Sequence, residues 1–196
     1  MILPIVQPLS FNITNFSDPE IASRIQCTGI AKIENGNIVL NPLINNGVER
    51  AIYGQPLRLK NPSNGNTPLA FDYQTPPNFS GFSLGLYGGT LDNIVAVEFD
   101  TYINEYDQPM HRVGINNNSV ASLEYKKFHI ESNIGKMGHA SGFTPNDSLS
   151  HQIDLREILP KWVTVEFSGA TRSSKEENVI HSWEFSTNLD LNINDN

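Results

Sequence analysis

Acidic side chains alternate with apolar ones along residues 95–103, Val-Ala-Val-Glu-Phe-Asp-Thr-Tyr-Ile. A β-strand directs alternate side chains to the same face, so the pattern predicts that Glu98, Asp100 and Tyr102 point together, with Val97 and Phe99 on the other face. The segment otherwise has the composition of a core strand, where two carboxylates are costly unless something neutralises them. The sequence therefore indicates that Glu98 and Asp100 have a compensating partner.

The residues that follow could bind a cation. Asn104, Asp107 and His111 belong to a short, turn-like stretch that contains Pro109. Carboxylate and amide oxygens suit calcium, whereas an imidazole combined with carboxylates suits a transition metal. The spacing predicts a compact divalent-metal site. The alternative is a solvated acidic loop with His111 on the surface.

Several blocks of the sequence resemble the legume (L-type) lectins. Residues 95–102, followed by Asn104, Asp107, His111 and Val-Gly-Ile, look like the metal-binding loop of that family. Further blocks are similar to the family and follow its order: residues 10–16, 50–59, 81–86, 153–168 and 181–186. Because the matches run from about Ser10 to about Leu189, the resemblance is a strong indication of fold.

The resemblance implies an all-β protein, a concanavalin A-like jelly-roll sandwich of antiparallel sheets. It implies an N-terminal extension over residues 1–9, a legume-lectin-like domain over residues 10–189 and a C-terminal tail over residues 190–196. The chain departs from the family after residues 74 and 131, where family members continue with further core strands. We therefore expect a sandwich that lacks some strands.

The resemblance also implies two metal ions. A transition metal, usually manganese, would be held by four side chains: Glu98, Asp100, Asp107 and His111. Calcium would be held by Asp100, Asp107, the side chain of Asn104 and the backbone carbonyl of Tyr102. Together, calcium and manganese would order the loop that binds sugar.

Sugar binding in the legume lectins, which this chain resembles, uses a side-chain amide, an aromatic ring, a backbone amide and an aspartate. The first three correspond to Asn104, Tyr102 and Gly81, and Ser173 or Ser174 lies in the loop that matches the family's specificity loop. The segment that carries the aspartate is missing here, and losing such an acceptor costs about 1–3 kcal/mol. We therefore expect a lectin for glycans or glycoproteins with weak monosaccharide recognition. A charged surface loop is the alternative for residues 169–177.

Two other functions are alternatives to a lectin. One is a lectin-related storage or defence protein without sugar binding, of the arcelin or amylase-inhibitor kind. The other is a glycoside hydrolase on the same sandwich, which would need a second glutamate where the chain has Ile103. Retaining hydrolysis requires two carboxyl groups about 5–5.5 Å apart. We therefore expect no enzymatic activity.

Composition narrows the partners and the compartment. The 196-residue chain carries a formal net charge of −8, which argues against nucleic acid and anionic membranes as partners. The single cysteine, Cys27, excludes an internal disulfide.

Residues 1–8 are too short and too rich in proline for a signal peptide. Secretory or vacuolar localisation and glycosylation are nevertheless expected from five sequons, at Asn12, Asn15, Asn78, Asn117 and Asn146. The family's flat back sheets pair between subunits, so the resemblance is compatible with a homo-oligomer.

Short strands are expected along most of the chain: residues 11–16, 31–34, 37–40, 51–59, 69–73, 94–103, 112–115, 119–125, 161–167 and 179–187. Asn35-Gly36 predicts a tight hairpin between the second and third of these. Residues 153–159 predict one helical turn before Pro160. No segment has the periodicity of a long amphipathic helix.

Overall fold

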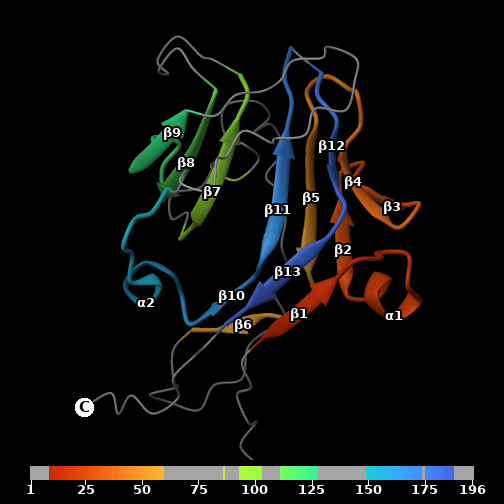
Figure 1. Ribbon diagram of the computed structural model, residues 1–196, viewed down its shortest axis with the longest axis horizontal. Coiled ribbons are helices and arrows are strands. Elements are labelled where there is room, and N and C mark those ends of the chain that lie inside the picture. Colours follow the sequence, from red (N-terminus) through yellow and green to blue (C-terminus); the bar gives the residue numbers. More distant parts are fainter. Residues whose placement is uncertain are drawn as a thin grey trace, which may run out of the picture. The chain divides into compact units, whose positions relative to one another are not determined.

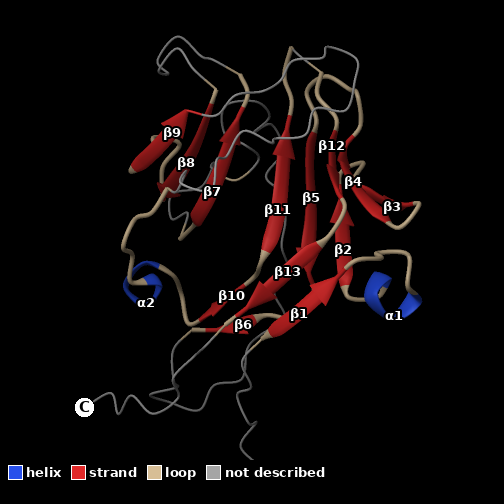
Figure 2. Ribbon diagram, in the orientation of Figure 1, coloured by secondary structure: helices blue, strands red, loops and turns tan. Residues whose placement is uncertain are grey.

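The computed structural model describes residues 9–59, 86, 93–102, 111–127, 149–173 and 175–187. The chain forms two compact units, and each is described by itself: residues 1–88 with 159–196, and residues 89–158. Strands dominate the described residues, and the two helices there, α1 (Pro19–Ala22) and α2 (Leu155–Ile158), are single turns (Figure 2). The predicted all-β class is confirmed. The domain boundaries at residues 10 and 189 stay a prediction.

The described strands of the first unit form four small antiparallel sheets (Figure 1). One pairs β1 (Ser10–Ile13) with β13 (Trp183–Ser186), and another pairs β6 (Leu57–Arg58) with β10 (Trp162–Val163). The third has the order β11 (Glu166–Ala170), β5 (Val48–Tyr53), β2 (Ile25–Thr28). The fourth has the order β12 (Asn178–Ile180), β4 (Asn37–Asn41), β3 (Lys32–Glu34). Strand β4 also packs against β5 and β11.

The predicted hairpin is present between β3 and β4. Asn35 and Gly36 adopt φ angles of 51° and 78°, which is the left-handed conformation that a tight two-residue turn requires. The ladder on either side pairs Glu34 with Asn37 and Ile33 with Ile38. Local turn chemistry thus sets the register of this pair of strands.

An aromatic cluster forms much of the first unit's core. The ring of Phe11 stacks on Tyr53 with centroids 4.1 Å apart and meets Trp183 edge-on at 5.4 Å. Phe167 packs against the same indole at 4.6 Å. Such pairs contribute roughly 0.5–1.5 kcal/mol each beyond the area they bury. Because these rings come from β1, β5, β11 and β13, the cluster joins strands that lie far apart in the sequence.

The second unit contains one described sheet with the order β7 (Val95–Asp100), β8 (Arg112–Asn117), β9 (Glu124–Lys127). All pairings are antiparallel, and the register places Glu98 opposite Gly114 and Asp100 opposite Arg112. The short helix α2 occupies the one helical turn that the sequence predicts. This sheet therefore carries the two alternating carboxylates.

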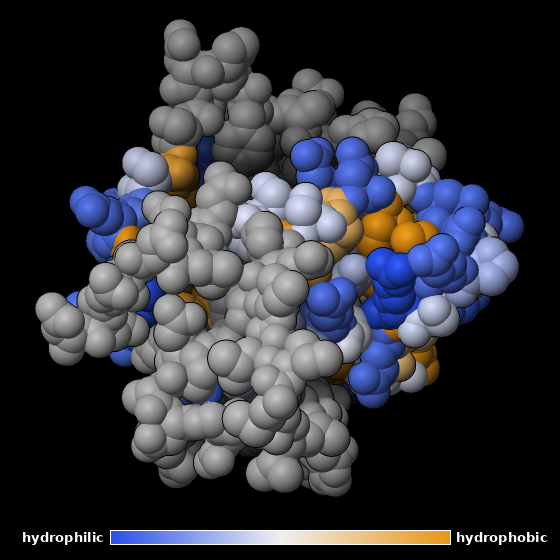
Figure 3. Space-filling model, turned by 90° about the horizontal axis from the view of Figure 1, so that it is seen from below, coloured by the Kyte–Doolittle hydropathy of each residue, from blue (hydrophilic) through white to orange (hydrophobic). Residues whose placement is uncertain are grey.

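One face of the described surface is mixed in character. In the space-filling view, hydrophobic residues lie in small patches among hydrophilic ones (Figure 3). None of the helices in the described ranges has the length and apolar character needed to span a bilayer.

Candidate functional site

Glu98 and Asp100 lie on one buried face of the β7–β8–β9 sheet. They retain 6% and 8% of their accessible surface, in agreement with the predicted alternation along β7. Directly opposite residues of an antiparallel pair share a face, so Arg112 and Gly114 of β8 face the same way. The strand pairing thus determines which groups meet the carboxylates.

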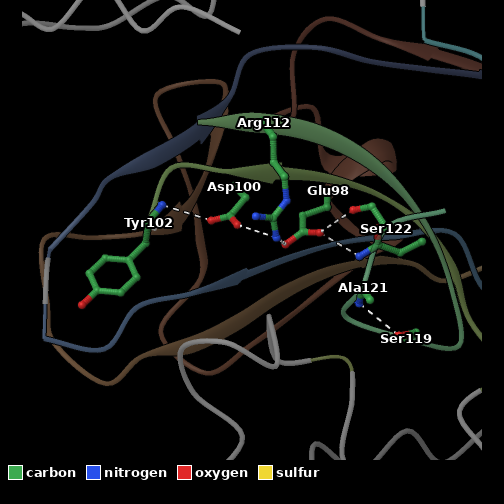
Figure 4. Close-up of polar contacts among 8 residues, drawn as sticks. Glu98, Asp100, Tyr102, Arg112, Ser119, Ala121 and Ser122 are labelled. Carbon is green, nitrogen blue, oxygen red and sulfur yellow. Dashed lines mark hydrogen bonds and ion pairs between the residues drawn. The ribbon is translucent and has the colours of Figure 1, made fainter. Parts of the chain in front are cut away.

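Arg112 supplies the positive charge at this face. Its Nη2 atom lies 2.9 Å from Asp100 Oδ2 and 3.8 Å from Glu98 Oε1, and the guanidinium is drawn between the two carboxylates in Figure 4. The arginine is itself only 7% exposed. A guanidinium stays protonated across the accessible pH range. One fixed positive charge is therefore shared by two buried negative charges.

The remaining carboxylate oxygens also face donors. Glu98 Oε2 accepts from Asn116 Nδ2 at 2.8 Å and from Ser122 Oγ at 3.4 Å. Asp100 Oδ1 accepts from the backbone N–H of Tyr102 at 3.0 Å. All four oxygens of the two carboxylates thus lie near a hydrogen-bond donor or the guanidinium.

Gly114 is required for this packing. It lies opposite Glu98, and a Cβ at this position would collide with the Oγ atom of Ser122. The absence of a side chain lets Ser122 reach across β8 to the glutamate. The face is closed by small and polar groups from β8 and the turn that follows it.

The apolar face of β7 is exposed, which corrects the interpretation of this segment as a core strand. The segment has the composition of a core strand, yet the side chains of Val97 and Phe99 are 62% and 59% exposed. The carboxylate face is the buried one, and Arg112, Asn116 and Ser122 contact the carboxylates there. The polar residues of this strand, and not the apolar ones, are enclosed.

The structure describes some of the predicted sugar- and metal-binding residues. Tyr102 follows β7 with its side chain 54% exposed, and His111 is half-buried immediately before β8. Ser173 is exposed in the loop after β11, in the first unit. Asn104, Asp107, Gly81 and Ser174 lie outside the described residues. Their predicted roles, and that of His111, stay predictions.

The loop that contains Ser173 is tied down at its start. The Thr171 hydroxyl accepts from the Gly47 N–H at 3.1 Å and donates to the Ile44 carbonyl at 3.0 Å. The backbone N–H of Thr171 also donates to the Gly47 carbonyl at 3.0 Å. These bonds fix the end of β11, so the path of the chain into Ser173 is set by residues 44–47.

The fit of a metal can be judged at Glu98 and Asp100. Within the described ranges, no three His, Cys, Asp or Glu side chains gather in an arrangement that could hold an ion. The guanidinium of Arg112 lies beside both carboxylates, so a transition metal bound to both of them would have to sit next to a buried positive charge. The donor set at this pair therefore does not fit a shared transition metal. Sequence reasoning missed Arg112 because it treated residues 112–115 only as a strand.

Comparison with known proteins identifies the family. The family model described as "Legume lectin domain" matches residues 69–142 and 136–196. A lectin from Bauhinia forficata is 32% identical, with 91% of this chain and 96% of that protein covered. The chain belongs to the legume lectin family. Lectin 7 of Medicago truncatula is 30% identical over 94% of this chain and 91% of that protein.

Solved legume lectins share the fold of this chain. A Bauhinia forficata lectin structure titled as a complex with GalNAc is 27% identical, with a TM-score of 0.68, and covers 92% of this chain and 98% of that one. The metal-free form of lectin I-B4 from Griffonia simplicifolia is 26% identical, with a TM-score of 0.70, and covers 92% and 100%. These neighbours confirm the concanavalin A-like sandwich that the sequence resemblance implies.

This legume lectin chain is shorter than its relatives' lectin domains. Its match to the L-type lectin-domain containing receptor kinase IX.1 of Arabidopsis thaliana, at 30% identity, spans 247 positions, 97% of this chain and only 38% of that protein. The chain has 196 residues, so at least 51 of those positions have no counterpart in it. This difference agrees with the expectation of an abbreviated domain.

Proposed function

We propose that this legume lectin chain binds carbohydrate through the segment that follows β7. Family membership supports the proposal, and so does the position of Tyr102 at the start of that segment. Its ring is exposed, while its backbone N–H is held by Asp100 at 3.0 Å. An exposed ring on an anchored backbone offers a flat apolar surface at low entropic cost. A Bauhinia forficata lectin structure whose title names GalNAc supports a carbohydrate as the ligand.

We infer that calcium, and not manganese, is the ion that this segment could use. The calcium ligands implied by the resemblance are all oxygens, from Asp100, Tyr102, Asn104 and Asp107, and such a set suits a hard cation. Each carboxylate oxygen has two lone pairs, so Asp100 can accept its present hydrogen bonds and still offer a ligand. The manganese set depends on Glu98 and Asp100 acting together, and Arg112 opposes that.

A second candidate is a lectin relative that does not bind sugar, such as a storage or defence protein. The ion pair of Arg112 favours this candidate, because the carboxylates already have a counter-ion without any metal. In either case the sequons support a glycosylated protein that is secreted or vacuolar. The lectin candidate would take glycans or glycoproteins as partners, and either candidate could assemble with copies of itself.

A glycan array read with and without chelator tests the proposal, and Tyr102→Ala is the informative variant. Loss of one aromatic contact is worth about 1 kcal/mol, which is roughly a fivefold loss of affinity. Tyr125→Ala is the matched control, because Tyr125 is another exposed tyrosine of the same unit, on β9. We expect glycan binding that falls in the first variant and persists in the second. A chain that binds no glycan would favour the second candidate, and equal binding by both variants would remove Tyr102 from the site.

A further inference from the structure

We propose that Arg112 is a built-in counter-ion that takes the place of a transition metal between Glu98 and Asp100. On this view the β7–β8 pair carries its own cation and does not need manganese to neutralise its carboxylates. The inference depends on the geometry of the sheet and not on sugar binding. A negative glycan array would therefore leave it standing.

The position of Arg112 is fixed by strand pairing and not by chance contact. It lies directly opposite Asp100 in the register of β7 and β8, and Val113 and Gly114 continue the ladder opposite Phe99 and Glu98. A slip of one residue would turn the arginine to the other face of the sheet. The ladder therefore holds the guanidinium at the carboxylates.

Burial keeps the guanidinium there. Glu98, Asp100 and Arg112 are all buried, so the pairing is not a solvated surface ion pair. If the Arg112 side chain moved away to admit a metal, its positive charge would have to be buried at another place or pass through the packed face to reach water. Leaving it in place would put a dication against a cation in a low-dielectric setting. Both routes oppose a transition metal held jointly by Glu98 and Asp100.

The carboxylate oxygens of the pair already have hydrogen-bond donors from the chain. Asn116 and Ser122 both donate to Glu98 Oε2, and the Tyr102 N–H donates to Asp100 Oδ1. With the guanidinium on the remaining oxygens, the charges and lone pairs are largely accommodated by the chain. A transition metal would have to compete with all of these contacts.

The consequence is a gain of metal binding when Arg112 is replaced. Arg112→His removes the fixed charge and provides an imidazole beside two carboxylates, a donor set that suits manganese. Manganese uptake would be followed by the electron paramagnetic resonance signal of free Mn²⁺, in an excess of calcium that fills any all-oxygen site. Arg156→Gln is the matched control, because Arg156 is an exposed arginine of the same unit, paired with Asp154.

We expect the unaltered chain and Arg156→Gln to leave the free Mn²⁺ signal unchanged. We expect Arg112→His to bind Mn²⁺ at least tenfold more tightly, to lose that uptake when Glu98→Gln is added, and to melt at a higher temperature with Mn²⁺ than without. A folded Arg112→His variant without any gain would overturn the proposal. If that variant does not fold, the unaltered chain still decides: Mn²⁺ uptake that Glu98→Gln abolishes would overturn the proposal, and no uptake would support it.

Discussion

The ion pair between Arg50 and Glu166 gives a sharp test of how the first unit is held together. Arg50 lies opposite Ser168 in the β5–β11 ladder and reaches diagonally to Glu166, with Nη1 2.9 Å from Oε1. The side chain of Arg50 is 1% exposed and that of Glu166 is 15% exposed. Removing one partner of a buried pair costs about 3–5 kcal/mol, because the other charge stays buried without compensation. We expect Arg50→Met to lower the free energy of unfolding by that amount.

The assay is urea unfolding followed by tryptophan fluorescence. With a slope of about 2–3 kcal/mol per M, the midpoint should fall by roughly 1–2.5 M. Replacing both residues by Met should restore most of the loss, since an apolar pair of similar volume is often as stable as the ions. The control is Arg24→Gln, whose partner Glu20 is exposed, and little change is expected there. An unchanged midpoint in Arg50→Met, or a double variant less stable than the single one, would refute the reasoning.

The pH dependence of the same variant has a defined sign. Burial raises the pKa of Glu166, and the nearby Arg50 guanidinium lowers it in part. A carboxyl whose folded pKa is raised stabilises the fold below its unfolded pKa, and that contribution is lost as the pH rises through the folded pKa. Without Arg50 the folded pKa rises further, so the penalty of Arg50→Met should be smaller near pH 4 than at pH 7. A penalty that is independent of pH would show that the charge of Glu166 is not its cause.

Two further predictions concern buried positions of the first unit. Gly169→Ala should destabilise the protein by about 1–3 kcal/mol, because the added methyl group would collide with the fully buried Asn41 amide. Adding Asn41→Ala should recover part of the lost stability, as measured by thermal unfolding. If the effects of the two substitutions simply add, this packing contact is contradicted. Glu49→Gln should raise the urea midpoint at pH 7 but not near pH 4, because burial alone raises the pKa of Glu49 and the wild-type glutamate loses stability as the pH rises through that value. Parallel pH profiles for Glu49→Gln and wild type would disprove the second prediction.

Features set by a few neighbouring residues could be predicted from the sequence. The hairpin at Asn35-Gly36 follows from turn chemistry, and the single helical turn before Pro160 follows from local pattern. Helix α1 was missed, although Asp18 caps it through its carboxylate and Pro19 begins it. Four residues are too few for helical periodicity to appear. The strand expected over residues 51–59 is divided into β5 and β6, with Gly54 and Pro56 in the break.

The core of the first unit was predictable only in part. Trp183 is buried, whereas Trp162 is half-buried on the two-residue strand β10, although both tryptophans lie in segments expected to form strands. Alternation identifies the face to which a side chain points, but it does not say which face another strand will cover. That depends on pairings between residues more than a hundred positions apart, such as Phe11 with Phe185.

The candidate site shows the same division between what is local and what is not. Alternation along β7 was enough to predict that two carboxylates share a face and need a counter-charge. It could not supply the identity of that charge, because His111 and Arg112 are adjacent and a slip of one residue exchanges the faces they present. The register that places Arg112 opposite Asp100 is a property of the β7–β8 pair, so it cannot be predicted from the sequence of either strand by itself. Whether this sheet binds a transition metal therefore depends on a pairing of one residue between two strands, which the substitution of Arg112 tests directly.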